Sequence, residues 1–97
     1  MTSMQTVARR RDNVVKRRIA GEILLIPIRG ELAEMEVIFA LDPTSEFIWD
    51  RLDGTRTLAD IAEDVLAEFD TDRETIQRDT LALVTELETA NLASAVH

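Results

Sequence analysis

The spacing of hydrophobic residues changes once along the chain, from a period of two to a period of three or four. Residues 14–19 mix apolar and basic positions, residues 22–28 are apolar on both faces, and residues 35–41 alternate again. These patterns predict three strands, with Ala20 and Gly21 as a tight turn between the first two. Because consecutive strands usually pair in order, we expect an antiparallel meander whose middle strand is covered on both faces. Residues 35–41 are then expected to form an edge strand of this sheet.

Beyond Leu41 the apolar spacing predicts three helices. Asp42 and Pro43 favour a helix start, and this first helix is expected to reach about residue 52. Gly54 is expected to take a left-handed conformation past its end. Thr57 with Asp60 resembles a capping box for the second helix. The third helix is expected from about residue 72 to residue 89. The expected fold is therefore α+β, a winged helix-turn-helix-like arrangement of a three-stranded antiparallel sheet followed by three helices.

Residues 49–65, WDRLDGTRTLADIAEDV, fit the shape of a DNA-reading helix-turn-helix, but the charge does not suit that use. The 97 residues carry 11 Lys and Arg against 19 Asp and Glu, a net charge of −8. DNA binding requires cations that neutralise phosphates. We therefore interpret this stretch as scaffold and expect no nucleic-acid partner. Trp49 is expected to be a core or semi-buried anchor, with a partner contact as the alternative.

The cations gather near the start of the chain. Residues 1–29 hold seven Lys and Arg and two acids, a balance of +5, which leaves −13 for residues 30–97. Residues 1–12 have no hydrophobic period and few large apolar groups, which is typical of a mobile basic arm. The expected organisation is this arm followed by a single domain over residues 13–97.

The sequence offers little for catalysis. Cysteine is absent, and the one histidine, His97, is the last residue, so we expect no enzyme, no metal site and no cofactor. A carrier protein is disfavoured because Ser45 stands three residues after Asp42 instead of directly after it. No apolar run approaches the roughly 20 residues that span a bilayer, and the start lacks a signal-peptide core. We expect a cytoplasmic protein that does not act at a membrane.

The third helix has an unusually wide apolar surface. Ile76, Thr80, Val84 and neighbouring positions make its main stripe, and Leu81 lies off that stripe. The pattern allows two interpretations: a helix wedged between two core elements, or one wall of a groove.

With this element order, residues 41–61 (LDPTSEFIWDRLDGTRTLADI) resemble the pyrroloquinoline quinone biosynthesis protein D family. No single position carries the match. It rests on the spacing of six residues that agree with the family pattern, which are Ile48, Trp49, Asp53, Gly54, Thr57 and Ile61. It extends more weakly from about residue 14 to residue 92. Asp42, Pro43 and Arg51 depart from the residues common in the family.

The resemblance implies a peptide-recognition domain. Such domains bind the leader segment of a ribosomally made precursor peptide and present it to a modifying enzyme, often a radical S-adenosylmethionine enzyme. In the family the leader adds as a strand beside the third strand and packs against the third helix. An exposed edge with an adjacent apolar groove is physically suited to strand addition.

The candidate peptide-binding residues follow from this placement. The edge backbone is Glu36, Val37, Ile38, Phe39 and Ala40, and the groove wall is Ile76, Gln77, Thr80, Leu81 and Val84. Pairing of the same edge with a second copy would give a homodimer. The alternative function is a small winged-helix DNA-binding regulator that uses the basic arm for phosphates.

Overall fold

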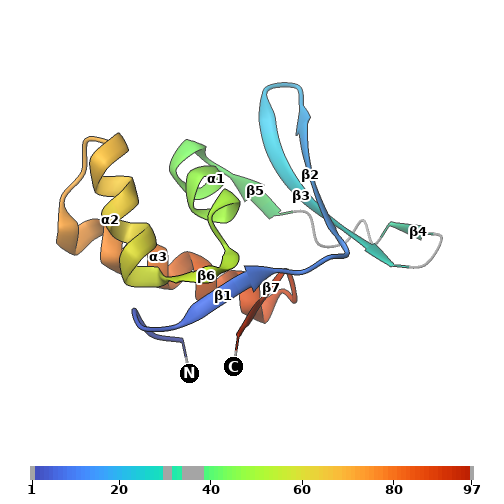
Figure 1. The fold of residues 1–97 in the computed structure, drawn as a ribbon. Helices are drawn as coiled ribbons and strands as arrows, with labels where there is room; N and C mark the ends of the chain where they lie inside the picture. The colour runs from blue at the N-terminus through green and yellow to red at the C-terminus, as the bar shows by residue number, and fades with distance from the viewer. Residues whose placement is uncertain (1, 30–31, 34–38, 97) are drawn as a thin grey trace.

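The computed structural model describes residues 2–29, 32–33 and 39–96, and has the α+β architecture expected from the sequence (Figure 1). Along the described part of the chain, five strands precede the first of three helices, one lies between the first and second helices, and one follows the third. In chain order the elements are β1 (Val7–Arg10), β2 (Val14–Ile19), β3 (Glu22–Arg29), β4 (Leu32–Ala33), β5 (Phe39–Leu41), α1 (Pro43–Asp50), β6 (Asp53–Thr57), α2 (Leu58–Glu68), α3 (Arg73–Thr89) and β7 (Ala93–Ala95).

The predicted meander is confirmed, with β3 in the middle. β2 pairs antiparallel with β3 along its whole length, from Val14 opposite Pro27 to Ile19 opposite Glu22. β5 pairs with the other edge of β3 at residues 23–25, and β4 pairs farther along that edge at residues 28–29. Of the predicted third strand, residues 39–41 form β5, and residues 35–38 lie outside the described part of the chain.

The two faces of β3 have different surroundings, contrary to the expectation that both would be covered. Ile23 and Leu25 lie in the core at 7% and 0% exposure. On the opposite face Leu24 and Ile26 are partly exposed, and Ile28 is 43% exposed. A strand with hydrophobic residues on both faces cannot reveal from sequence alone that only one face is packed.

The prediction of a mobile arm over residues 1–12 is wrong for β1. This strand is the centre of a second antiparallel sheet with the order β6-β1-β7, and Ala8 is fully buried in it. Hydrogen bonds from Arg10 N to Leu52 O and from Leu58 N to Thr6 O join the segment to the helical region. The prediction failed because β1 has only four residues and its paired residues lie 44 or more positions away in sequence.

Each predicted helix start is confirmed by a capping side chain. The Asp42 carboxylate accepts from Ser45 N, the Asp72 carboxylate accepts from Thr75 N, and Thr57 forms a reciprocal capping box with Asp60. These side chains satisfy backbone amides that have no partner within the helix.

The turn between α1 and α2 differs from the prediction in one respect. α1 ends at Asp50, and Gly54 has the expected positive φ of 84° but lies inside β6. Across this strand the register with β1 shifts, since Val7 faces Thr57 and Arg9 faces Asp53. The positive φ of Gly54 therefore belongs to an irregular strand and not to the end of a helix.

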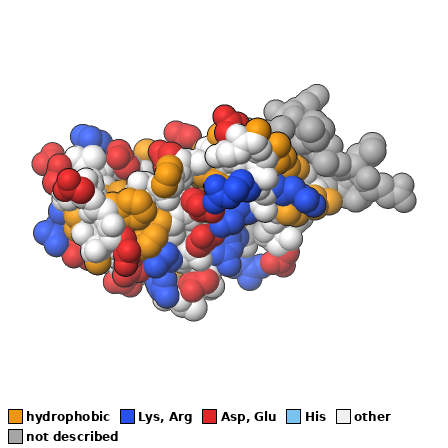
Figure 2. All heavy atoms as spheres, turned by 90° about the horizontal axis from the view of Figure 1, so that it is seen from above, with side chains coloured by type: hydrophobic (Ala, Val, Ile, Leu, Met, Phe, Trp, Pro, Cys, Tyr) orange, Lys and Arg blue, Asp and Glu red, His pale blue; other side chains and the backbone are white. Residues whose placement is uncertain are grey.

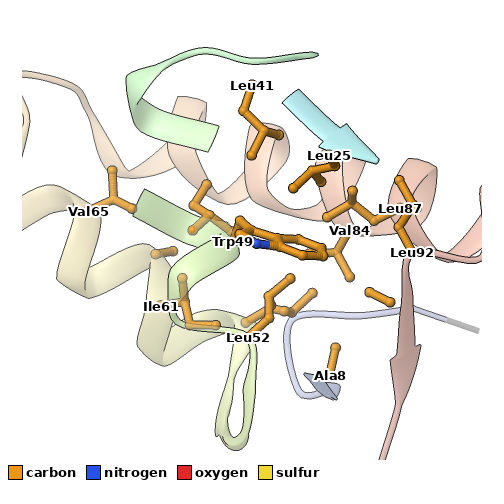
Figure 3. Close-up of a cluster of buried hydrophobic side chains, with 14 of the residues drawn as sticks. Ala8, Leu25, Leu41, Trp49, Leu52, Ile61, Val65, Val84, Leu87 and Leu92 are labelled. Atoms are coloured by element: carbon orange, nitrogen blue, oxygen red, sulfur yellow. The ribbon is translucent and has the colours of Figure 1, made fainter. Parts of the chain in front are cut away.

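Trp49 lies at the centre of the hydrophobic core, as predicted, with 3% of its surface exposed (Figure 3). Leu25 and Leu41 come from the β2–β3–β5 sheet, Val84 and Leu87 come from α3, and Ala8 comes from β1. The core thus joins both sheets to the helices. Among the described residues, no helix combines the length and apolar character needed to cross a bilayer.

Candidate functional site

A hollow of about 590 Å³ lies between β5, the first turns of α1 and one face of α3. We name it the β5–α3 groove. It is lined by Phe39, Ala40, Asp42, Thr44, Ser45, Ile48, Phe69, Asp70, Thr71, Ile76, Asp79, Ala82, Leu83 and Glu86.

The floor of the groove is apolar. Ile48 and Ile76 are each 2% exposed and belong to the core, whereas Phe39, Phe69 and Leu83 are partly exposed and pack against it. The ring of Phe69 meets that of Phe47 edge to face, with centroids 5.2 Å apart. A ligand that covered the partly exposed side chains would remove apolar surface from water, which favours binding.

One side of the groove is the edge of a sheet. Within the described residues β5 pairs only with β3, so the backbone groups on its other edge have no strand partner there. Phe39 and Ala40 both belong to β5 and line the groove. An extended peptide laid along β5 would gain main-chain hydrogen bonds and side-chain contacts together.

Four carboxylates surround this apolar floor. Asp42 precedes α1, Asp70 follows α2, and Asp79 and Glu86 lie two turns apart on α3. Among the residues that the structure describes, no Lys or Arg lines the groove. Asp42 also caps α1, with Oδ1 accepting from Ser45 N at 2.7 Å.

Comparison with known proteins places this arrangement in a family. The family model for Coenzyme PQQ synthesis protein D (PqqD) matches residues 22–93, which is 72 of the 97 residues. The chain belongs to the PqqD family. The matched region runs from β3 to β7 and contains the whole β5–α3 groove, while β1 and β2 precede it.

Two relatives and two solved structures resemble this PqqD-family chain. Proteins named PqqA binding protein, from strains PXO99A and KACC10331 / KXO85 of Xanthomonas oryzae pv. oryzae, are each 39% identical over 57 residues. Those residues are 59% of this chain, and they span less than two thirds (62%) of each relative's length.

The structure of TbiB1 in complex with the TbiA(beta) leader peptide is 25% identical, with a TM-score of 0.70 over 92% of this chain and 98% of that chain. The structure of lasso peptide synthetase B1 complexed with the leader peptide is 24% identical, with a TM-score of 0.71 over 91% and 98%. The second likeness concerns the fold alone.

The residues predicted for the groove of this PqqD-family chain are only partly brought together. Phe39, Ala40 and Ile76 line the groove, and Glu36, Val37 and Ile38 lie outside the described residues. Thr80 and Val84 are fully buried in the core. Gln77 and Leu81 are not among the lining residues, and Leu81 is partly buried against the core.

The face of α3 that lines the groove is therefore rotated from the predicted one. It carries Ile76, Asp79, Ala82, Leu83 and Glu86. The broad apolar surface of α3 is mostly used for packing, because the helix contacts α2, β7 and α1. A signal was present in the sequence: Ile76 and Leu83, seven residues apart, share a helical face with Asp79 and Glu86.

Several cations of the chain gather elsewhere, and Figure 2 shows a group of Lys and Arg side chains near the middle of the face that it presents, with others at the left end. Lys16 Nζ lies 2.8 Å from Glu46 Oε2 and 2.9 Å from Asp50 Oδ1. Hydrogen bonds to Asp50 and then to Glu46 raise the pKa of Lys16 above its ordinary 10.5. These two ion pairs link β2 to α1, and none of their three side chains lines the groove.

Proposed function

We propose that this PqqD-family chain binds the leader segment of a precursor peptide in the β5–α3 groove. The leader extends the β2–β3–β5 sheet along β5 and places alternate side chains on the apolar floor. The observation that carries the proposal is the position of a sheet edge directly beside a partly exposed apolar floor. It is supported by the same fold in a protein solved with a leader peptide and by relatives named for PqqA binding.

The chain acts as a non-catalytic adaptor in this proposal. A leader held by its backbone along β5 leaves the remainder of the precursor free to enter another protein's active site. That protein is a modifying enzyme, and we propose the radical S-adenosylmethionine type. The pathway produces either the quinone cofactor or another modified peptide.

A homodimer made by pairing two β5 edges would occupy the same backbone groups as the leader. The outer edge of β2 is poorly suited to self-pairing, because Lys16, Arg17 and Arg18 would meet like charges. We therefore propose that the peptide-bound form contains one copy of this chain.

A DNA-binding function is disfavoured by the charge of α3. A recognition helix has to approach phosphates, and α3 carries two cations against four anions, a net charge of −2. Arg73, one of the two cations, pairs with Glu63 at 2.9 Å.

The proposal is tested with peptides selected from a displayed library of random 15-residue sequences on the wild-type chain. Selected peptides are then measured against Ala82→Arg, which fills the groove, and against Ala67→Arg, which adds the same charge on the exposed surface of α2. Both changes keep a good helix former in a helix.

We expect Ala82→Arg to weaken binding at least tenfold and Ala67→Arg to leave it within twofold of wild type. Failure to select any peptide, or selection of peptides that bind Ala82→Arg as tightly as wild type, would overturn the groove as the binding site. Circular dichroism establishes that both variants remain folded.

A further inference from the structure

We propose that the β5–α3 groove selects leader segments in which Lys or Arg flanks an apolar anchor. The inference rests on the proposed function and specifies its ligand. The apolar floor can accept many hydrophobic side chains, so discrimination has to come from the charged groups around it.

The carboxylates approach the groove from separate parts of the chain. Asp42 stands at the end of β5, Asp70 stands in the connection between α2 and α3, and Asp79 and Glu86 extend from α3. A peptide in the groove would therefore meet negative charge along more than one side. A leader rich in Asp or Glu would be repelled by the same groups.

None of the described Lys and Arg side chains lines the groove to offset these acids. Arg78 Nε lies 3.9 Å from Asp79 Oδ1, but the two side chains are 70% and 60% exposed, so this contact is weak. Arg78 does not line the groove.

Four other described cations are paired with acids outside the groove. Lys16 contacts Glu46 and Asp50, Arg51 and Arg56 contact Asp64, and Arg73 contacts Glu63.

The two acids on α3 also predict a spacing. Glu86 follows Asp79 by seven positions on the helix, which is about 10 Å along the axis at 1.5 Å per residue. An extended peptide advances roughly 3.3 Å per residue, and its side chains return to the same face every second residue. Two basic residues separated by two or four positions could therefore face Asp79 and Glu86 together.

The test compares peptide selections on three proteins from the same random library. They are the wild type, the double variant Asp79→Lys/Glu86→Lys, and the control Asp12→Lys/Glu22→Lys. The control changes the net charge equally but at exposed positions outside the groove. Peptides are scored only if Ala82→Leu, which fills the groove without adding charge, reduces their binding when it is added to the protein that selected them. Every scored peptide then uses the groove.

We expect wild type and control to enrich Lys and Arg over Asp and Glu, with pairs two or four positions apart. The Asp79→Lys/Glu86→Lys variant should reverse the preference. Each matching basic residue should tighten binding to wild type roughly two- to fivefold, and added salt should weaken this gain.

Groove-dependent peptides without any charge preference, or with the same preference in all three proteins, would overturn the inference and leave the proposed function standing. An absence of groove-dependent peptides would overturn both.

Discussion

Arg10 Nη1 donates a hydrogen bond of 2.7 Å to the backbone carbonyl oxygen of Asp50, the last residue of α1. The same nitrogen donates to the carbonyl oxygen of Trp49 at 3.1 Å. The last carbonyl groups of a helix have no partner within it, and a cation there also complements the helix dipole. The N-terminal strand thus supports the helix that carries the central core residue.

Replacement of Arg10 by Met should destabilise the protein by about 1 kcal/mol, because the carbonyl oxygen of Asp50 loses its donor and that of Trp49 keeps only backbone donors such as Leu52 N. Arg11→Met is the matched control, since Arg11 is exposed and no described hydrogen bond involves its side chain. Urea denaturation, monitored by circular dichroism, gives the unfolding midpoint of both variants. Equal midpoints for the two would contradict a structural role for Arg10.

Gly54→Val should lower the free energy of unfolding of the protein by roughly 1 to 2 kcal/mol, because a β-branched residue strains a backbone with φ of 84°. A Cβ at this position would meet Arg9 Cβ and Val96 Cγ2 at 3.6 Å, which is ordinary contact, so the penalty is conformational. Gly54→Asn should cost less, since Asn tolerates positive φ better than Val does. Thermal unfolding compares the two, and equal losses would point to steric crowding instead.

Ala20→Asn should stabilise the hairpin of β2 and β3. Ala20 and Gly21 form a two-residue loop in which both φ angles are positive, 52° and 84°. This is the pattern of a type I′ turn, for which Asn-Gly is the preferred pair. We expect a gain of about 0.5 to 1 kcal/mol in the free energy of unfolding. A lower unfolding midpoint than wild type would show that the turn has another geometry.

Stability should decrease as the pH falls below about 4, partly through Asp72. Its carboxylate accepts hydrogen bonds from Thr75 N and Oγ1, which lower its pKa below the ordinary 3.8. The folded state therefore binds this proton less readily than the unfolded state. The stabilisation is present above pH 3.8 and is lost as the pH falls through the lowered pKa.

Asp72→Asn separates titration from capping, because Asn also caps helices but does not titrate. The loss of stability between pH 6 and pH 3, measured by urea denaturation, should be smaller in Asp72→Asn than in wild type. An identical pH dependence in both proteins would exclude Asp72 as a contributor.

Local patterns in the sequence predicted most of the secondary structure. The helix starts at Asp42, Thr57 and Asp72 each depend on a side chain and a backbone amide three residues apart, so a short window contains the whole interaction. The pairing of β1 with β6 and β7 depends instead on contacts between distant segments. No local pattern in Val7–Arg10 indicates them.

Of the α3 residues predicted for the groove wall, only Ile76 lines the β5–α3 groove. Periodicity identified α3 as a helix with excess apolar surface, yet it could not divide that surface between α2, β7 and a ligand. Thr80 and Val84 proved to be core residues, while Asp79, Ala82 and Leu83 line the groove. The orientation of a helix about its own axis is fixed by packing with distant elements.

Strand addition at β5 is tested by hydrogen exchange of the Phe39–Leu41 amides, detected by NMR with and without a groove-selected peptide. Protection should rise in this strand on binding, because new main-chain hydrogen bonds form there. A peptide with N-methylated backbone amides should bind far more weakly, because it lacks donors for the β5 edge. Full-affinity binding by the methylated peptide, with unchanged exchange at residues 39–41, would rule out strand addition at β5.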